Sequence, residues 1–136
     1  MYLCELTLPS PEENLACDEI LLDSAESAGN EILRLWEPQE YFIVLGYGNS
    51  AAAEVNLSWC EQNKISILRR FTGGGTVLQG PGCLNYSLIL RFSECEFLQT
   101  ISRTNAYILE RHREMFTTLL QSPVETAGVT DLEFAI

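Results

Sequence analysis

Apolar and polar residues recur along the chain with periods that predict its helices. The run Ser10-Pro11-Glu12-Glu13 supplies an N-cap, a proline in the first turn and a capping-box glutamate. We therefore expect a helix over residues 11–27, closed by Gly29 and Asn30. Apolar residues spaced by three and four between residues 97 and 120 predict a long amphipathic helix that ends before Pro123.

Short apolar runs bounded by turn residues predict strands at residues 2–7, 32–36, 42–45, 65–68, 76–78, 84–92, 124–126 and 132–136. A Glu-Pro-Gln-Glu turn predicts a hairpin between the second and third runs, and Gly80-Pro81-Gly82 predicts another between residues 76–78 and 84–92. Asn56 is expected to cap a short helix over residues 57–60. Few helices and many hairpins predict an α+β fold with a mixed, largely antiparallel sheet.

The length and composition predict one domain over residues 1–136. No stretch approaches the roughly 18 apolar residues of a membrane-spanning helix, and the first residues lack the features of a signal peptide. Five cysteines without a Cys-x-x-Cys pair indicate neither a disulfide framework nor a zinc knuckle. We expect a cytoplasmic protein with reduced thiols, no metal site and no membrane contact.

The charge is strongly acidic, with eight Lys and Arg against 19 Asp and Glu and a net charge of −11. Such a charge repels nucleic acid phosphates at long range, so nucleic acid is not an expected partner. Arg69 and Arg70 stand together beside three glycines and leave a local positive spot.

This arginine-glycine segment, residues 69–77, carries the densest chemical signal in the chain. Glycines allow several main-chain N–H groups to point at one anion, and a neighbouring guanidinium can hold a carboxylate or phosphate. No Gly-Lys-Ser/Thr follows, so the loop is not a Walker motif. The alternative is a flexible hairpin loop without a ligand.

Other motifs have plainer interpretations. Residues 46–51 match a dinucleotide fingerprint formally, but a hairpin strand and a short helix are the wrong context, which favours a loop beside a ligand pocket. His112, the sole histidine, lies on the apolar stripe of the long helix and is expected to be packed there. Cys83 has no local base or cation, so a structural role is expected. No catalytic residue is assigned.

The order and spacing of several motifs resemble the lipoate-protein ligase A family of the biotin/lipoate ligase superfamily. The motifs are Asn14-Leu15-Ala16-Cys17-Asp18-Glu19, Leu33-Arg34-Leu35-Trp36, Val44-Leu45-Gly46-Tyr47-Gly48-Asn49, Glu54-Val55-Asn56, Arg69 to Val77, Gly80 to Leu88 and Gly128-Val129-Thr130-Asp131-Leu132. The resemblance covers nearly the whole chain and implies the N-terminal part of a class II aminoacyl-tRNA synthetase/biotin ligase-like catalytic domain.

The resemblance also implies a reaction. Lipoate and ATP would form lipoyl-AMP, with Mg²⁺ as an accompanying ion and no bound cofactor. A lysine of a lipoyl domain, in 2-oxoacid dehydrogenases or the glycine cleavage H protein, would then accept the lipoyl group. The residues it places at the substrate are Trp36, Tyr47, Arg70, Thr72, Gly73, Gly74, Gly75, Thr76 and Asn85, and those at the nucleotide are Gly75, Asn85 and Asp131.

Ordinary structural roles compete with some of these assignments. Trp36 could be a core residue, Tyr47 a loop anchor, and Asn85 and Asp131 turn or cap residues. The sequence also departs from the family pattern, because Gln79 stands where many relatives carry His. The family's lysine would follow residue 136, and Lys64, the sole lysine present, is not expected to replace it.

Several functions therefore remain open. The chain could be a fragment or split half completed by a missing C-terminal half, or a shortened, inactive relative. A lipoyl or octanoyl transferase of the same superfamily, which uses a cysteine nucleophile instead of ATP, is the nearest alternative. A non-catalytic fragment that binds lipoate or a partner is another. Biotin ligase is disfavoured because its Gly-Arg-Gly-Arg loop is absent.

Overall fold

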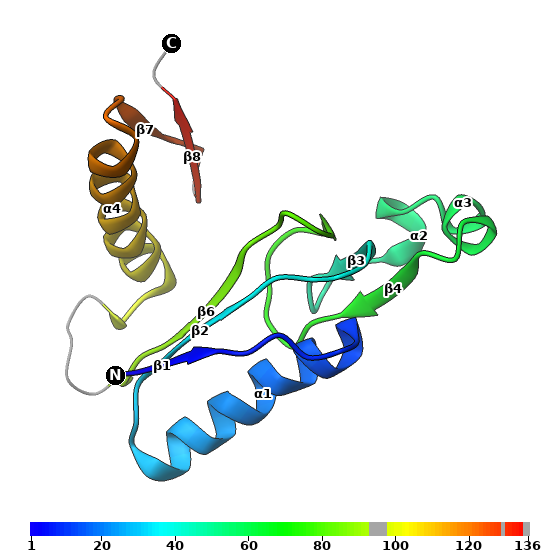
Figure 1. The fold of residues 1–136 in the computed structure, drawn as a ribbon, viewed down its shortest axis with the longest axis horizontal. Coiled ribbons are helices and arrows are strands. Elements are labelled where there is room, and N and C mark those ends of the chain that lie inside the picture. Colours follow the sequence, from blue (N-terminus) through cyan, green and yellow to red (C-terminus); the bar gives the residue numbers. More distant parts are fainter. Residues whose placement is uncertain (93–97, 129, 135–136) are drawn as a thin grey trace. The chain divides into compact units, whose positions relative to one another are not determined.

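The computed structural model describes residues 1–92, 98–128 and 130–134 (Figure 1). The chain divides into two compact units, Met1–Leu90 and Arg91–Ile136, and each is described by itself. The interpretation of residues 1–136 as one domain stays a prediction.

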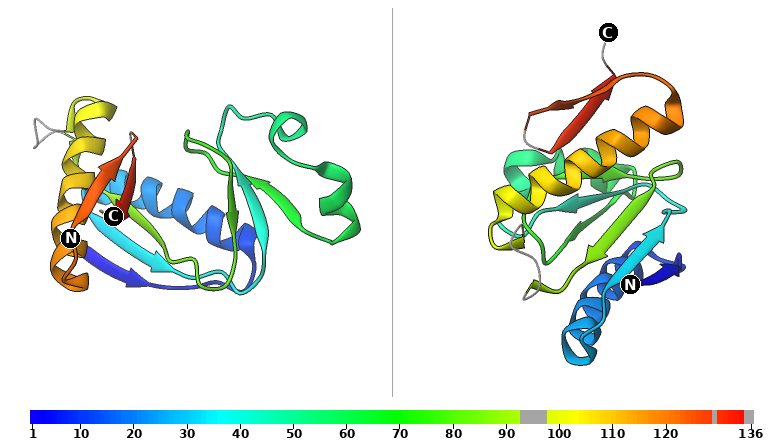
Figure 2. Two further views of the ribbon diagram at one scale, coloured as in Figure 1. Left: turned by 90° about the horizontal axis from the view of Figure 1, so that it is seen from above. Right: turned by 90° about the vertical axis from the view of Figure 1, so that its left-hand side faces the viewer.

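The first unit contains a three-stranded sheet in the order β1-β2-β6. Strand β2 (Ile32–Trp36) lies in the middle, parallel to β1 (Tyr2–Glu5) and antiparallel to β6 (Asn85–Ile89). Helix α1 (Pro11–Ala28) runs along this sheet and contacts β2 and β6 (Figures 1 and 2).

A second three-stranded sheet of this unit has the order β4-β3-β5. Its central strand β3 (Phe42–Leu45) is parallel to β4 (Ser66–Arg69) and antiparallel to β5 (Val77–Gln79). Two short helices, α2 (Ala51–Glu54) and α3 (Leu57–Gln62), connect β3 to β4. Asn56 caps α3 as predicted, since its Oδ1 accepts a hydrogen bond of 3.1 Å from the N–H of Trp59.

Both predicted hairpins are wrong. Strand β2 pairs with β1 and β6, whereas β3 pairs with β4 and β5, so residues 37–41 carry the chain from one sheet to the other. Residues 80–84 carry it back, because β5 belongs to the second sheet and β6 to the first. A 2.8 Å hydrogen bond from the N–H of Gly82 to Oε1 of Glu37 ties the two crossings together.

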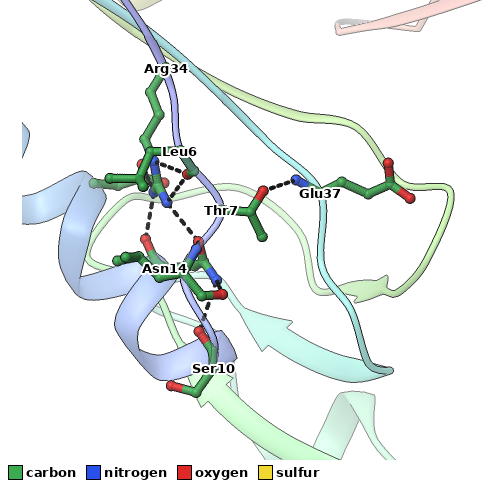
Figure 3. Close-up of polar contacts among 8 residues, drawn as sticks. Leu6, Thr7, Ser10, Asn14, Arg34 and Glu37 are labelled. Atoms are coloured by element: carbon green, nitrogen blue, oxygen red, sulfur yellow. Dashed lines mark hydrogen bonds and ion pairs between the residues drawn. The ribbon is translucent and has the colours of Figure 1, made fainter.

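The predicted start and end of α1 are confirmed. The Ser10 hydroxyl accepts from the N–H of Glu13, and the Glu13 carboxylate accepts from the N–H of Ser10. Gly29 ends the helix in the left-handed conformation, with φ of 68°. The first turns of α1 also face a buried arginine of β2, Arg34 (Figure 3).

The Arg34 side chain is 0% exposed and donates five hydrogen bonds (Figure 3). Its acceptors are the carbonyl oxygens of Leu6 and Asn14, Oδ1 of Asn14, and Oδ1 of Asp18 at 2.7 Å. Asn14 in turn donates to the carbonyl oxygens of Leu8 and Ser10. The network satisfies the buried charge by joining β2, α1 and the segment before α1.

An apolar cluster of Trp36, Phe42 and Val44 forms the core of the first unit, with Leu15 and Leu68 packed against it. Phe42 and Val44 are buried, and both belong to β3. Because α1 supplies Leu15 and β4 supplies Leu68, this cluster joins both sheets to the helix.

The second unit consists of helix α4 (Ile101–Leu120) and the antiparallel pair β7 (Val124–Ala127) and β8 (Asp131–Phe134). Thr100 caps α4, so the predicted start is too early, although residue 97 itself lies outside the described residues. The predicted end at Leu120 is confirmed. No helix of the described part is long and apolar enough to span a bilayer.

The fold class is confirmed as α+β with few helices and mixed, largely antiparallel strand pairs. Of the five strand pairs in the described residues, β1 with β2 and β3 with β4 are parallel. The pairs β2 with β6, β3 with β5, and β7 with β8 are antiparallel.

Candidate functional site

Two glycine-containing loops meet at one edge of the β4-β3-β5 sheet. Residues 46–50 follow β3 and residues 70–76 follow β4, and parallel neighbours end at the same edge of their sheet. The N–H of Arg70 donates to the Leu45 carbonyl at 3.0 Å, and the N–H of Tyr47 donates to the Thr72 carbonyl at 2.9 Å. We call these segments the first loop (46–50) and the glycine loop (70–76).

Arg69 holds the first loop. Its Nη1 donates to the carbonyl oxygens of Gly46 at 2.8 Å, Tyr47 at 2.9 Å and Asn49 at 2.8 Å. One guanidinium nitrogen therefore fixes the turn that the Gly-x-Gly motif creates. This contact gives the motif a structural purpose in the loop pair, and its place beside a ligand pocket stays a prediction.

Arg70 holds the glycine loop in the same way. Its Nε and Nη2 donate to the carbonyl oxygen of Gly73, at 3.1 and 2.8 Å, and Nη2 also donates to that of Gly75 at 2.8 Å. Within the described part of the chain, Arg70 Nη1 makes none of these bonds and stays available. The half-buried guanidinium thus both shapes the loop and carries its positive charge.

The two loops touch through Gly46, Asn49 and Gly74. A Cβ added to Gly46 would lie 2.1 Å from the carbonyl oxygen of Gly74, so glycine is required at this approach. Asn49 Nδ2 donates to the same carbonyl at 3.2 Å and to Thr76 Oγ1 at 3.1 Å. Gly74 itself has φ of 95°, a conformation that favours glycine.

The remaining predicted site residues lie in different surroundings. Trp36 is 4% exposed in the core cluster, beneath Arg34, whose guanidinium carbon lies 5.3 Å from the indole centroid. Tyr47 is 70% exposed on the first loop. Asn85, at the start of β6, donates to Gln79 Oε1 and to the carbonyl oxygen of Cys83. Asp131 begins β8 in the second unit.

An apolar pocket of about 490 Å³ lies in the first unit, between the α2–α3 segment and strands β3 and β5. Apolar side chains such as Ile43, Trp59 and Leu78 line it, and Thr76 at the end of the glycine loop borders it. Neither Trp36 nor Tyr47 is part of its lining. The pocket and the two aromatic residues that the resemblance places at the substrate are therefore at separate places in the first unit.

Cysteine, histidine and acidic residues form no metal site in the described part of the chain, where no group of three such side chains gathers. Cys4, Cys17, Cys60 and Cys83 are free thiols, and Cys95 lies outside the described residues. Burial raises the pKa of the Cys17 thiol, against the opposing effect of Arg34. The His112 ring packs on α4 with its centroid 6.5 Å from that of Phe116.

The sequence interpretation missed the roles of two residues. The sequence places Asn49 in the formal dinucleotide motif and in one family motif and assigns it no role, although an amide after Gly-x-Gly can bridge two loops. Arg34 occupies an inward position of β2 with Ile32 and Trp36, and a charge in such an alternating pattern signals a buried network.

The model of the lipoyl protein ligase A/B catalytic domain matches residues 10–134. The chain belongs to this family. A probable lipoate-protein ligase A of Mycoplasma pneumoniae is 33% identical over 132 residues, which are 94% of this chain and 37% of that protein. An octanoyltransferase, LipM of Carboxydothermus hydrogenoformans, is 40% identical over 81 residues, which are 59% of this chain and 30% of that protein.

Solved ligase structures share the fold. A bi-partite lipoate protein ligase of Thermoplasma acidophilum, described with its E2 lipoyl domain, matches with a TM-score of 0.80 and 25% identity over 98% of this chain and 51% of its own. A T. acidophilum ligase structure with bound lipoic acid also has a TM-score of 0.80 at 25% identity, with 98% and 54% covered.

Lipoate-protein ligase A bound with ATP matches with a TM-score of 0.79 and 27% identity, and 98% of this chain and 52% of that chain are covered. The chain thus spans 37% of the M. pneumoniae relative and about half of each of these solved chains.

Proposed function

We propose that the glycine loop binds the carboxyl end of lipoate, and the acyl phosphate of lipoyl-AMP, in a lipoate-protein ligase reaction. The observation that carries the proposal is the hydrogen bonding of the loop in this family member. The carbonyl oxygens of Gly73, Gly74 and Gly75 all accept from side chains, namely those of Arg70 and Asn49. Main-chain N–H groups of the loop are then left to donate to an anion.

The charge distribution supports this proposal. A chain with a net charge of −11 repels an anionic ligand on average, so binding requires a local cation. Arg69 and Arg70 supply two charges at the loop pair, and Arg70 Nη1 makes none of the bonds to the loop carbonyls in the described residues. We assign Arg70 the ligand contact and Arg69 the support of the first loop.

We propose the complete lipoate-protein ligase reaction because the chain belongs to this family. Relatives have been solved with lipoic acid and with ATP, and we propose both as substrates here, with Mg²⁺ accompanying ATP. The acceptor would be a lysine of a lipoyl domain, in 2-oxoacid dehydrogenases or the glycine cleavage H protein. The T. acidophilum ligase is bi-partite and has been analysed together with its E2 lipoyl domain, which supports a lipoyl-domain partner and a second polypeptide in the reaction.

The other residues of the predicted site enter the proposal with narrower roles. Tyr47 would contact the acyl tail, and Thr72 and Thr76 would flank it on either side of the three glycines. The burial of Trp36 beneath Arg34 favours the alternative interpretation of this residue as part of the core. Asn85 would face the phosphate or the adenosine, and the nucleotide role of Asp131 stays a prediction from the family resemblance.

An octanoyltransferase is the second candidate, favoured by the 40% identity to LipM over 81 residues. A transferase would accept the acyl group without ATP, whereas a ligase forms pyrophosphate only when lipoate and ATP are both present. Assays of pyrophosphate release and of acyl transfer from an octanoylated carrier protein therefore separate the two activities.

The binding proposal is tested by calorimetric titration of the folded chain with lipoate and with a non-hydrolysable lipoyl-AMP mimic. Arg70→Gln should weaken binding of both ligands by about tenfold or more, the worth of one hydrogen bond to a charged group. Lys64→Gln is the matched control, because it removes the same charge from an exposed position at the opposite end of β4. Equal affinities for wild type and Arg70→Gln, or no binding by the folded wild type, would overturn the proposal.

A further inference from the structure

We infer that Asn49 is a positioning residue, which fixes the Gly74–Gly75 peptide so that the Gly75 N–H is presented to the anionic head of the acyl ligand. The inference rests on the proposed function and adds to it a residue outside the arginine-glycine motif. It assigns to Asn49 a part in the preference for a charged ligand head.

The orientation follows from the geometry of one peptide group. Asn49 Nδ2 donates to the Gly74 carbonyl oxygen at 3.2 Å, which turns that oxygen toward the first loop. In a trans peptide the C=O and the following N–H point in opposite directions, and the described part of the chain contains no cis peptide. The Gly75 N–H therefore points away from Asn49, and none of the hydrogen bonds in the described residues uses it.

The chemistry of its partners determines which end of the Asn49 amide faces the glycine loop. Besides Gly74, Nδ2 lies 3.1 Å from Glu54 Oε2 and 3.1 Å from Thr76 Oγ1. A main-chain carbonyl and a carboxylate can only accept, so the amide nitrogen and not its oxygen must occupy this place. The assignment of Nδ2 thus follows from the acceptors around it.

Asn49 is itself held from both sides. Its carbonyl oxygen accepts from Arg69 Nη1 at 2.8 Å, and its N–H donates to the Gly46 carbonyl at 3.1 Å. The absence of a side chain at Gly46 lets the Gly74 carbonyl occupy this position, since a Cβ there would overlap with that oxygen. The Asn49 amide is therefore held in place before a ligand binds. A prearranged donor such as the Gly75 N–H needs no reorganisation when an anion binds.

The test compares two ligands with the same tail, lipoate and neutral lipoamide, titrated calorimetrically into the full chain. Asn49→Leu keeps the size of the side chain and removes its donor. We expect its affinity for lipoate to fall by about tenfold or more, and its affinity for lipoamide to change by less than about threefold. Asn63→Leu is the control, because Asn63 also donates to a main-chain carbonyl, that of Trp59, and should leave both affinities unchanged.

Circular dichroism shows whether each variant is folded. If Asn49→Leu is unfolded, Asn49→Asp takes its place, since it keeps size and polarity and sets a carboxylate against the Gly74 carbonyl and Glu54. It should show the same selective loss of lipoate affinity. A fall of equal size for lipoate and lipoamide, or unchanged lipoate affinity, would overturn the positioning role while the proposed function stands. A folded wild type that binds neither ligand would overturn both.

Discussion

Replacing Arg34 by methionine tests whether the buried network of the first unit stabilises the fold. The guanidinium is 0% exposed and donates five hydrogen bonds, to Leu6, Asn14 and Asp18. Methionine fills a similar long volume without a charge, so the change isolates the polar interactions from packing. The variant leaves the acceptors behind without their donor.

The expected decrease in the free energy of unfolding depends on what happens to those acceptors. Removing one partner of a buried ion pair costs about 3–5 kcal/mol, because the other charge is left uncompensated. Asp18 retains a side-chain exposure of 16%, so water recovers part of its solvation, and Asn14 Oδ1 keeps its bond from the N–H of Leu8. We therefore expect the lower end of the range, about 3 kcal/mol, against a total stability of about 5–15 kcal/mol.

The assay is urea unfolding followed by circular dichroism at a helix wavelength, which does not depend on Trp36 beneath the substituted side chain. Arg113→Met is the matched control, since Arg113 pairs with Glu110 on exposed α4 and should leave the free energy of unfolding nearly unchanged. A loss below about 1 kcal/mol for Arg34→Met would refute the reasoning. It would show that the desolvation penalty of the buried charge is about as large as the stabilisation from its hydrogen bonds and ion pair.

A substitution tests the loop contact, and an alkylation experiment tests the partly buried thiol of Cys17. Gly46→Ala should lower stability by about 1–3 kcal/mol and weaken lipoate binding, because its Cβ would meet the Gly74 carbonyl oxygen; urea unfolding and calorimetry measure this. Gly48→Ala, with no atom within 4 Å of its added Cβ, is the control, and equal losses for both variants would contradict the contact. Burial raises the pKa of Cys17, so less thiolate exists at a given pH, and its alkylation by iodoacetamide should rise at higher pH than that of an unfolded peptide. Mass spectrometry of the modified peptide across pH measures the profile, and a coincident profile would contradict a raised pKa.

In the second unit, local sequence signals predict the end of helix α4 but not its start. The period of apolar residues and Pro123 predict the end of α4 correctly, because a helix end depends on neighbours within one turn. The start is different, since Thr100 caps the helix through the N–H of Arg103 although apolar residues continue upstream of it. Apolar spacing alone therefore places the beginning of α4 too early.

The strand partners are the part of the fold that the sequence predicts wrongly. The connections at residues 37–41 and 80–84 are as short as those of hairpins, and a local interpretation pairs the strands on either side. In the structure β2 and β3 are each the central strand of a different sheet, so each buries a face against partners distant in sequence. Pairing is decided by that burial and by register, which no turn motif reveals.

The sequence by itself determined the α+β class, the capping of α1, the arginine-glycine motif and the family, because these depend on residues within a few positions or on their order. The tertiary structure alone decided which strands pair, that Arg34 is buried, and that Asn49 joins two loops. Arg34 and Asn14 are 20 positions apart, Asn49 and Gly74 are 25, and Glu37 and Gly82 are 45. Contacts over such separations exist only when the sheets have formed, because the packed chain and not the local sequence brings their donors and acceptors together.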